Sequence, residues 1–218
     1  MTYVAWTAVY EGATDAAYFD ILIPRVMEDI IFSHGIGNSD IADSPAVRPQ
    51  RDTVDATAKY TCDNKMVVDL VFFHADTGGH GLVDNQVTHA TTFCQAIQTL
   101  CEWPQKRCIP VLPRHETEAW VLADPMAVTS ALGYRGSPES IGLPTNAAAA
   151  EQVRDPKAIL KAAVAQVRGR RRPVEAEQIL PSIAQRQSMP QLRKAQSFTR
   201  FEERLKVALS DLGCISLP

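Results

Sequence analysis

The sequence lacks several features that would place it in a familiar class. No run of roughly 18 or more apolar residues occurs in its 218 residues, so we expect no transmembrane helix. No basic segment precedes an apolar one near the N-terminus, so we expect no secretory signal. The glycines at Gly78-Gly79 lack the spacing of a dinucleotide-binding loop. These absences favour a soluble protein, which we expect to be cytoplasmic.

The cysteines also lack a recognisable pattern. They are five in number, and no two have the CxxC spacing of a zinc or redox motif. A zinc site built from them is an alternative that this spacing disfavours. We therefore expect reduced thiols at every one of these positions: Cys62, Cys94, Cys101, Cys108 and Cys214.

Charge is distributed unevenly along the chain. Residues 1–150 contain nine basic and 18 acidic side chains, a net charge of −9, whereas residues 151–218 contain 13 and seven, a net charge of +6. An acidic body with a basic second half suits a metal site that also binds an anionic polymer. The alternative is a solvated helical surface without a partner.

Three apolar runs predict buried strands at residues 3–10, 67–74 and 108–112. Helical periodicity follows each run, at about residues 14–31, 84–101 and 116–124. Alternation of strands and helices predicts an α/β fold, in which helices flank a parallel sheet. Residues 53–62 could form a short helix or an edge strand. Trp120, on the apolar side of its helix, is expected to lie in the core.

The second half of the sequence changes character. Residues 133–149 are rich in glycine, serine and proline and predict a linking loop, and the segments after it are helical only. We therefore expect an α/β catalytic domain over residues 1–132 and a helical extension packed on it over residues 150–218. Ser197 is expected to cap the last helix.

Acidic residues follow each predicted strand. Gly12 allows a sharp turn after the first strand, and Thr14 is expected to cap the next helix. Because parallel strands end at one edge of a sheet, acids distant in sequence should converge there. Oxygen ligands of this kind suit Mg²⁺ or Mn²⁺, although any single acid could be an ordinary surface charge. The candidate metal ligands are Glu11, Asp15, Asp76, Glu116 and Glu118.

Basic residues offer a second candidate site. A cluster in the helical half could bind backbone phosphates, or it could form an exposed basic loop without a ligand. His80 and His115 lie near the predicted sheet edge, where loop histidines without a role are common. The candidate nucleic-acid-binding residues are Arg168, Arg170, Arg171 and Arg172.

Several motifs resemble a known family. Glu11-Gly12-Ala13-Thr14-Asp15 and Phe73-His74-Ala75-Asp76 resemble the Toprim domain of topoisomerases, primases and OLD-type (overcoming lysogenization defect) nucleases. The chain looks more closely like a family of small prokaryotic stand-alone Toprim-like proteins. The further motifs that support this resemblance are Glu118-Ala119-Trp120-Val121-Leu122-Ala123-Asp124, Asp155-Pro156-Lys157 and Ser197-Phe198-Thr199-Arg200-Phe201.

The resemblance implies a Toprim fold, a Mg²⁺-dependent site and cleavage of nucleic-acid phosphodiesters. Glu11 would be the general acid/base or a metal ligand, Asp76 the main metal-holding residue, and Asp15 and Glu118 further ligands. The implied catalytic residues are Glu11, Asp76 and Glu118. Related nucleases often work beside an ATPase in antiviral defence systems, so the resemblance implies such a partner. It leaves a homo-oligomer open.

The chain departs from the Toprim pattern at one position. His74 occupies the place of the first aspartate of the Asp-x-Asp motif, and imidazole is a poor ligand for Mg²⁺. The sequence is therefore compatible with two functions. One is a metal-dependent nuclease, and the other is a non-catalytic Toprim-fold subunit that docks on an ATPase.

Overall fold

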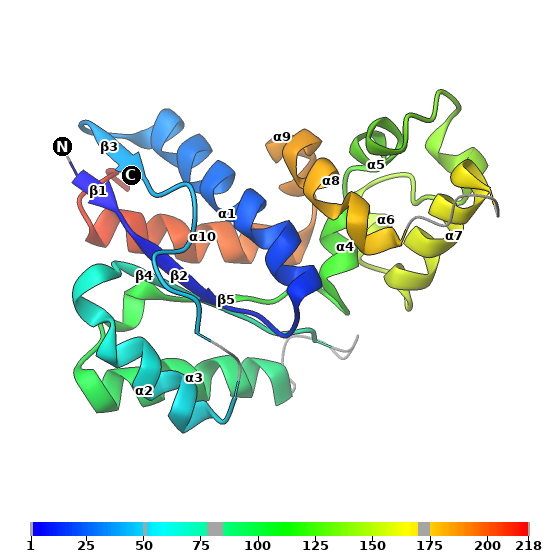
Figure 1. The fold of residues 1–218 in the computed structure, drawn as a ribbon. Coiled ribbons are helices and arrows are strands. Elements are labelled where there is room, and N and C mark those ends of the chain that lie inside the picture. The colour runs from blue at the N-terminus through cyan, green and yellow to red at the C-terminus, as the bar shows by residue number, and fades with distance from the viewer. Residues whose placement is uncertain (1, 50–51, 78–84, 170–174, 218) are drawn as a thin grey trace.

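The computed structural model describes residues 2–49, 52–77, 85–169 and 175–217 (Figure 1). Its central sheet contains three parallel strands in the order β2 (Trp6–Val9), β4 (Leu70–His74) and β5 (Cys108–Val111). A second parallel pair joins β1 (Thr2–Val4) to β3 (Ser39–Ile41). The predicted α/β class with a parallel sheet is confirmed.

The first predicted strand is divided in two at Ala5. The side chain of Asp69 accepts a hydrogen bond from the Ala5 N–H at 2.8 Å, and the Asp69 N–H donates to the Ala5 carbonyl at 2.8 Å. Ala5 is thereby tied to the segment that precedes β4. On either side of it, β1 pairs with β3 and β2 pairs with β4.

Both faces of the central sheet are buried. In β4, Leu70 and Phe72 belong to one hydrophobic cluster, whereas Val71 and Phe73 belong to the other. This alternation follows from the two-residue period of a strand. It also explains why the strand sequence is an unbroken apolar run, as expected where helices cover a sheet on both sides.

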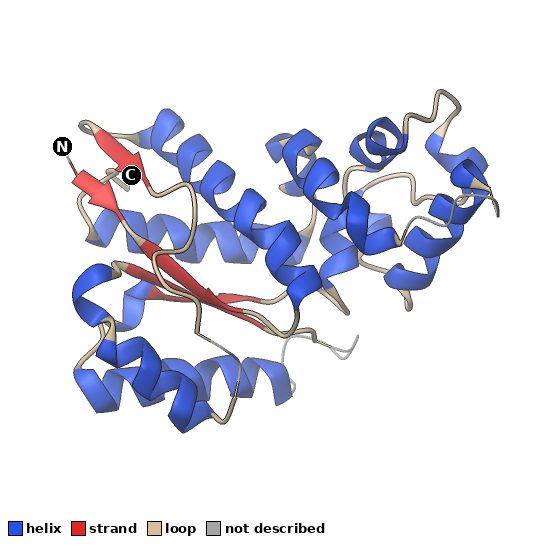
Figure 2. Ribbon diagram, in the orientation of Figure 1, coloured by secondary structure: helices blue, strands red, loops and turns tan. Residues whose placement is uncertain are grey.

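Helices form a layer on each side of the sheet (Figure 2). On one side lie α1 (Ala13–His34) and α10 (Gln196–Asp211), and on the other lie α2 (Val54–Asp63) and α3 (Asn85–Cys101). The segment left undecided from the sequence is therefore a helix. None of the helices in the described ranges combines the length and apolar character needed to span a bilayer.

The remaining α-helices lie mainly beyond the carboxyl end of the sheet. They share one hydrophobic cluster with β2, α1 and α10. The boundary predicted between residues 1–132 and 150–218 stays a prediction, although the two parts have this core in common. These helices are α4 (Thr117–Val121), α5 (Pro125–Leu132), α6 (Ala147–Ala150), α7 (Pro156–Arg168), α8 (Leu180–Arg186) and α9 (Met189–Leu192).

Polar contacts fix α4 within this core. Trp120 is fully buried, as expected, and its indole N–H donates to the Ser197 hydroxyl at 2.7 Å. The carboxylate of Glu151 accepts the N–H groups of Gln196 and Ser197, each at 2.8 Å. The expectation that Ser197 caps α10 is therefore wrong, because a carboxylate from 46 residues earlier takes that role.

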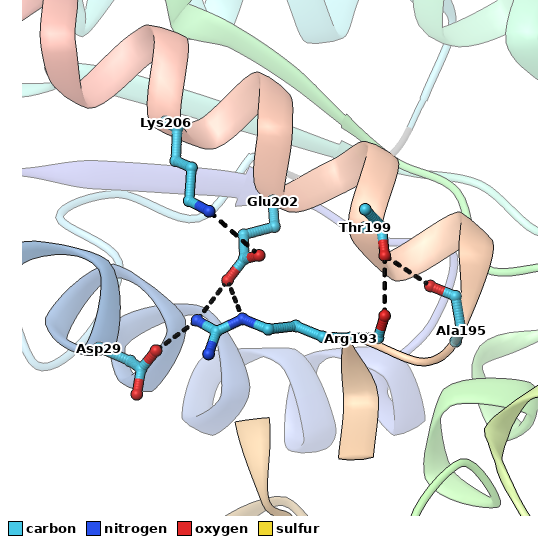
Figure 3. A network of polar contacts seen from close by, with 6 residues as sticks. All are labelled: Asp29, Arg193, Ala195, Thr199, Glu202 and Lys206. Atoms are coloured by element: carbon cyan, nitrogen blue, oxygen red, sulfur yellow. Dashed lines mark hydrogen bonds and ion pairs between the residues drawn. The ribbon is translucent and has the colours of Figure 1, made fainter. Parts of the chain in front are cut away.

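An ion-pair network joins α9 and α10 to α1 (Figure 3). The guanidinium of Arg193 donates to Glu202 Oε1 at 2.8 and 2.5 Å and also to Asp29 of α1. Lys206 lies 3.4 Å from the other oxygen of Glu202. Hydrogen bonding to Glu202 raises the pKa of Arg193, which stays charged. Because Glu202 is buried, these cations offset the cost of removing its carboxylate from water.

The expectation of reduced thiols is wrong for four of the five cysteines. Cys62 forms a disulfide with Cys101, and Cys94 forms one with Cys108, with Cα–Cα distances of 5.8 and 5.7 Å. The partners come from α2, α3 and the start of β5, so they meet only after these elements pack. Sequence spacing carries no signal for such long-range pairs. Cys214 is free and buried.

We predict that reduction destabilises the layer formed by α2 and α3. The disulfides join cysteines 39 and 14 residues apart. A disulfide that closes a loop of such a length contributes about 3 kcal/mol to the free energy of unfolding, because it restricts the unfolded chain. Urea unfolding with and without reductant measures this loss. Peptide mapping without reductant should identify both linked pairs and leave Cys214 as the alkylated thiol of the unfolded chain. Alkylation of all five cysteines without reductant would contradict the two disulfides.

Candidate active site

Acids from three segments line one pocket at the carboxyl edge of the sheet. Glu11 follows β2, Asp76 follows β4, and Glu116 and Glu118 follow β5. The pocket has a volume of about 270 Å³. The parallel arrangement of the strands accounts for this convergence. Its lining residues are Glu11, Gly12, Thr14, Asp15, Asp76, Glu116, Glu118 and Lys157.

The turn between β2 and α1 is closed by Asp15. Its Oδ2 accepts a hydrogen bond from the Gly12 N–H at 3.0 Å, across the first turn of the helix. Gly12 is the N-cap residue, so the expectation that Thr14 caps the helix is wrong. A glycine has no side chain to accept from the helix. The carboxylate of Asp15 instead folds back onto the cap, where it also suits the helix dipole.

Thr117 connects two of the acid-bearing segments. Its hydroxyl donates to Asp15 Oδ1 at 2.6 Å, and its backbone N–H donates to Asp76 Oδ1 at 3.2 Å. Thr117 is the first residue of α4 and is almost fully buried. It therefore fixes Asp15 and Asp76 relative to each other from the side of the core.

His74 lies on the core side of these acids and does not line the pocket. The side chain is fully buried, and its ring centroid lies 4.8 Å from that of Phe19. His74 Nε2 lies 3.1 Å from Thr117 Oγ1 and 3.4 Å from Asp76 Oδ1. The residue that interrupts the Toprim pattern thus contacts the acids without facing the pocket.

The acids after β5 have altered acidities. Burial raises the pKa of Glu118 to about 7, and the nearby charges of Glu116 and Asp76 add to this rise, whereas Lys157 opposes it. Burial also raises the pKa of Glu116, with a further contribution from Asp76. Glu116 Oε2 is a buried oxygen without a hydrogen-bond partner in the described part of the chain. The raised pKa values show that water and neighbouring groups stabilise the charged forms of these two carboxylates less than water alone would.

Lys157 is the basic residue that lines the pocket. It occupies the first turn of α7, its charge lowers the pKa of both Glu116 and Glu118, and its backbone N–H binds the Glu116 carboxylate. It is assigned no role from the sequence, although Asp155-Pro156-Lys157 is one of the motifs that support the family resemblance. Thr117 is also assigned no role from the sequence. Its place in the sequence between Glu116 and Glu118, two predicted metal ligands, is the signal that could have identified it.

A strained loop presents Glu116. His115 has a φ of 69°, a left-handed conformation that is uncommon for residues other than glycine. Its N–H donates to Thr77 Oγ1 at 2.9 Å, and this hydroxyl donates to the Pro113 carbonyl at 3.0 Å. Thr77 thereby ties the segment after β4 to the loop after β5. His115 itself does not line the pocket.

Arg168, the described member of the predicted basic cluster, does not line this pocket. Arg168 is exposed at the end of α7, and eleven residues of helix separate it from Lys157, or roughly 16 Å along the axis. Arg170, Arg171, Arg172, Gly78, Gly79 and His80 lie outside the described residues. A larger groove of about 1,000 Å³ runs along α2 and α3, and among the described residues its acidic lining consists of Asp55 and Asp63.

The acidic pocket suits a cation that retains water. In the described ranges, no three His, Cys, Asp or Glu side chains are arranged to hold a metal ion by themselves. Mg²⁺ often uses one or two carboxylates together with waters and substrate phosphates, rather than a cage of protein ligands. The lining carboxylates and the unpartnered Glu116 Oε2 supply oxygen donors of the required kind.

We predict that Glu118 makes folding stability depend on pH. The folded pKa, about 7, lies above the ordinary value of 4.5, so the protonated carboxyl stabilises the folded chain. This contribution is complete below about pH 4.5 and is lost as the pH rises through about 7, with an upper limit of about 3 kcal/mol. Urea unfolding in EDTA between about pH 5 and pH 8 measures it.

Replacement by the neutral isostere isolates this effect. Glu118→Gln should show a smaller fall in the free energy of unfolding over this range than the wild type. Glu139→Gln, which changes an exposed glutamate, serves as the matched control and should follow the wild type. Parallel curves for the wild type and Glu118→Gln would contradict the raised pKa.

Comparison with known proteins identifies a family without assigning an activity. No curated protein and no solved structure matches the chain. One family profile, described as "Domain of unknown function (DUF4276)", matches residues 10–206. The matched region begins one residue before Glu11 and includes every pocket-lining residue. The chain therefore belongs to the DUF4276 family.

Proposed function

We propose that the protein is a metal-dependent nuclease that hydrolyses nucleic-acid phosphodiesters at a Toprim-type carboxylate site. The observation that supports this proposal is the convergence of acids from three strand ends on one pocket, together with Lys157. A cluster of carboxylates repels an anionic substrate unless a cation lies between them. In this pocket the carboxylates can hold the cation, and the lysine can bind the anionic substrate.

The cation is Mg²⁺ or Mn²⁺, and the residues that hold it are drawn from Glu11, Asp15, Asp76, Glu116 and Glu118. Asp15 already accepts hydrogen bonds on both oxygens, from Gly12 and Thr117, so its main contribution is to hold the turn. A bound divalent ion supplies charge stabilisation at the phosphate and lowers the pKa of a bound water.

The chain itself supplies proton transfer and binding of the phosphate. Burial raises the pKa of Glu118 to about 7 in the metal-free chain, and a cation bound in the pocket lowers it again, so that Glu118 can accept and release a proton near neutral pH. Its proton exchanges with the attacking water or with the leaving oxygen. Lys157 of α7 lines the same pocket, and its ammonium group binds the phosphate oxygens.

The surroundings of the substrate follow from charge. Arg168, together with Arg170, Arg171 and Arg172 that follow it in sequence, contacts the nucleic-acid backbone; Arg168 is the one of these that the structure describes. By resemblance to OLD-type systems, the proposal includes an ATPase partner, a cytoplasmic setting and a role in antiviral defence. The two disulfides are evidence against the cytoplasmic part of this proposal, because cytosolic thiols are generally kept reduced.

A non-catalytic docking subunit is the second candidate. Two observations favour it: no preformed metal-binding group exists among the described side chains, and a histidine replaces an acid of the Toprim pattern. In this case the acidic edge would bind a partner protein through its charge. Glu11→Ala would then leave biological activity unchanged, and the protein would co-purify with the ATPase.

We predict that purified protein cleaves DNA or RNA when Mg²⁺ or Mn²⁺ is present and not in EDTA. Glu11→Ala and Asp76→Ala should abolish cleavage, because they remove pocket carboxylates that hold the ion. Glu118→Gln should slow cleavage by about 10²–10⁴-fold, because it removes the proton-transfer group. Gel assays with plasmid, single-stranded DNA and RNA measure these rates.

Glu139→Gln is the control, since it neutralises an acid distant from the pocket in sequence and exposed on the surface. It should cleave at the wild-type rate. Circular dichroism and thermal unfolding must show that each pocket variant is folded. Absence of cleavage with either ion, for the protein alone and with its ATPase, would reject the nuclease and favour the docking subunit.

A further inference from the structure

Two buried polar side chains lie directly behind the pocket acids and are not explained by packing alone. His74 ends β4 with no exposed surface, and Thr117 begins α4 with 1% exposed. Burial of such groups is costly unless they form hydrogen bonds. Their contacts go to the acids of the pocket, so they belong to the surroundings of the site rather than to a purely apolar core.

The direction of the hydrogen bonds follows from the number of available protons. The Thr117 hydroxyl has one proton, and its 2.6 Å contact with the Asp15 carboxylate requires that this proton be donated to Asp15. Thr117 Oγ1 can then only accept from His74 Nε2, at 3.1 Å. The network therefore assigns a proton to Nε2 of the His74 ring.

The other ring nitrogen has a different environment. His74 Nδ1 is buried and has no hydrogen-bond partner among the described residues. It lies 3.9 Å from Asp15 Oδ2, the oxygen that accepts from Gly12. This separation is too long for a hydrogen bond. The ring is thus held by its Nε2 side, where Thr117 and Asp76 lie.

We propose that His74 and Thr117 are positioning residues for the metal-binding acids. Hydrogen bonds run from His74 Nε2 to Thr117 Oγ1 and from Thr117 Oγ1 to Asp15, while the Thr117 N–H binds Asp76. This relay holds Asp15 and Asp76 at a fixed separation, although their charges repel each other. The inference rests on the proposed function, because it assigns these residues a role in cation binding.

The relay also accounts for a histidine at a position where the Toprim pattern has an acid. An aspartate at position 74 would place another negative charge behind the pocket, fully removed from water. Imidazole instead donates a proton to the network at this point. His74 therefore acts on the ion through Thr117 and the acids, and it does not bind the ion.

Paired substitutions test the relay. Thr117→Val removes the hydroxyl and keeps the shape, whereas Thr117→Ser keeps the hydroxyl. His74→Gln places an amide N–H near the position of Nε2, whereas the shorter His74→Asn reaches only the position of Nδ1. We expect the affinity for Mn²⁺ to fall about 10–100-fold in Thr117→Val and His74→Asn, as for other residues that orient metal ligands. Thr117→Ser and His74→Gln should stay within a few-fold of the wild type.

The control removes a buried hydroxyl elsewhere. Thr61 of α2 is fully buried, and its hydroxyl donates to the Thr57 carbonyl at 2.9 Å, so Thr61→Val carries a comparable packing change away from the pocket. Its affinity for Mn²⁺ should equal that of the wild type. Calorimetric titration with MnCl₂ measures each affinity, and unfolding in urea reports the stability of each variant.

Nitrogen NMR of histidine-labelled protein adds a readout that does not depend on metal. His74, assigned by the signal lost in His74→Gln, should carry its proton on Nε2. A ring protonated only on Nδ1 would overturn the relay. Equal Mn²⁺ affinities in Thr117→Val and Thr117→Ser, with a wild type that binds, would overturn the positioning role alone. A wild type that binds no Mn²⁺ would overturn both this role and the proposed function.

Discussion

Repulsion among carboxylates at one edge of the sheet is the constraint on which the local structure depends. Two charges about 4 Å apart interact with roughly 1 kcal/mol in water and about 4 kcal/mol near a protein surface. Three of the acids have a nearby group that offsets this cost. Asp15 accepts from Gly12 and Thr117, Asp76 accepts from Thr117, and Glu116 lies beside Lys157. Glu118, the most deeply buried, responds instead through a pKa of about 7.

The short helix α4 connects this constraint to the rest of the molecule. Its first turn presents Thr117 and Glu118 to the site, and Trp120, two residues after Glu118, is fixed to the C-terminal helices through Ser197. Gln187 accepts from the Tyr18 hydroxyl and donates to the Trp120 carbonyl, which joins α1 to the same point. The helical half thus determines where two site residues stand, and it contributes Lys157 directly.

Parts of this arrangement could be predicted from the sequence because they depend on local pattern. Apolar runs locate parallel strands, and parallel strands bring Glu11, Asp76 and Glu118 to one edge without knowledge of any side-chain contact. The errors fall where distant segments decide the outcome. Cys62 pairs with Cys101 only through helix packing, and α10 is capped by Glu151 rather than by its own serine. Lys157 and Thr117 were missed for the same reason, since their neighbours come from other elements.

The loss of folding stability caused by the pocket acids supports the proposal that they bind a cation. Burial disfavours the charged form of Glu118, and burial and Asp76 disfavour that of Glu116, so both carboxylates reduce stability near neutral pH. Neutral glutamines of the same shape would avoid this cost. Proteins accept such losses mainly at sites where activity requires them. A surface that only docks a partner could present its acids in full contact with water. A set of mutually repelling acids beside a lysine, with Glu118 buried among them, is better suited to a cation and a phosphate.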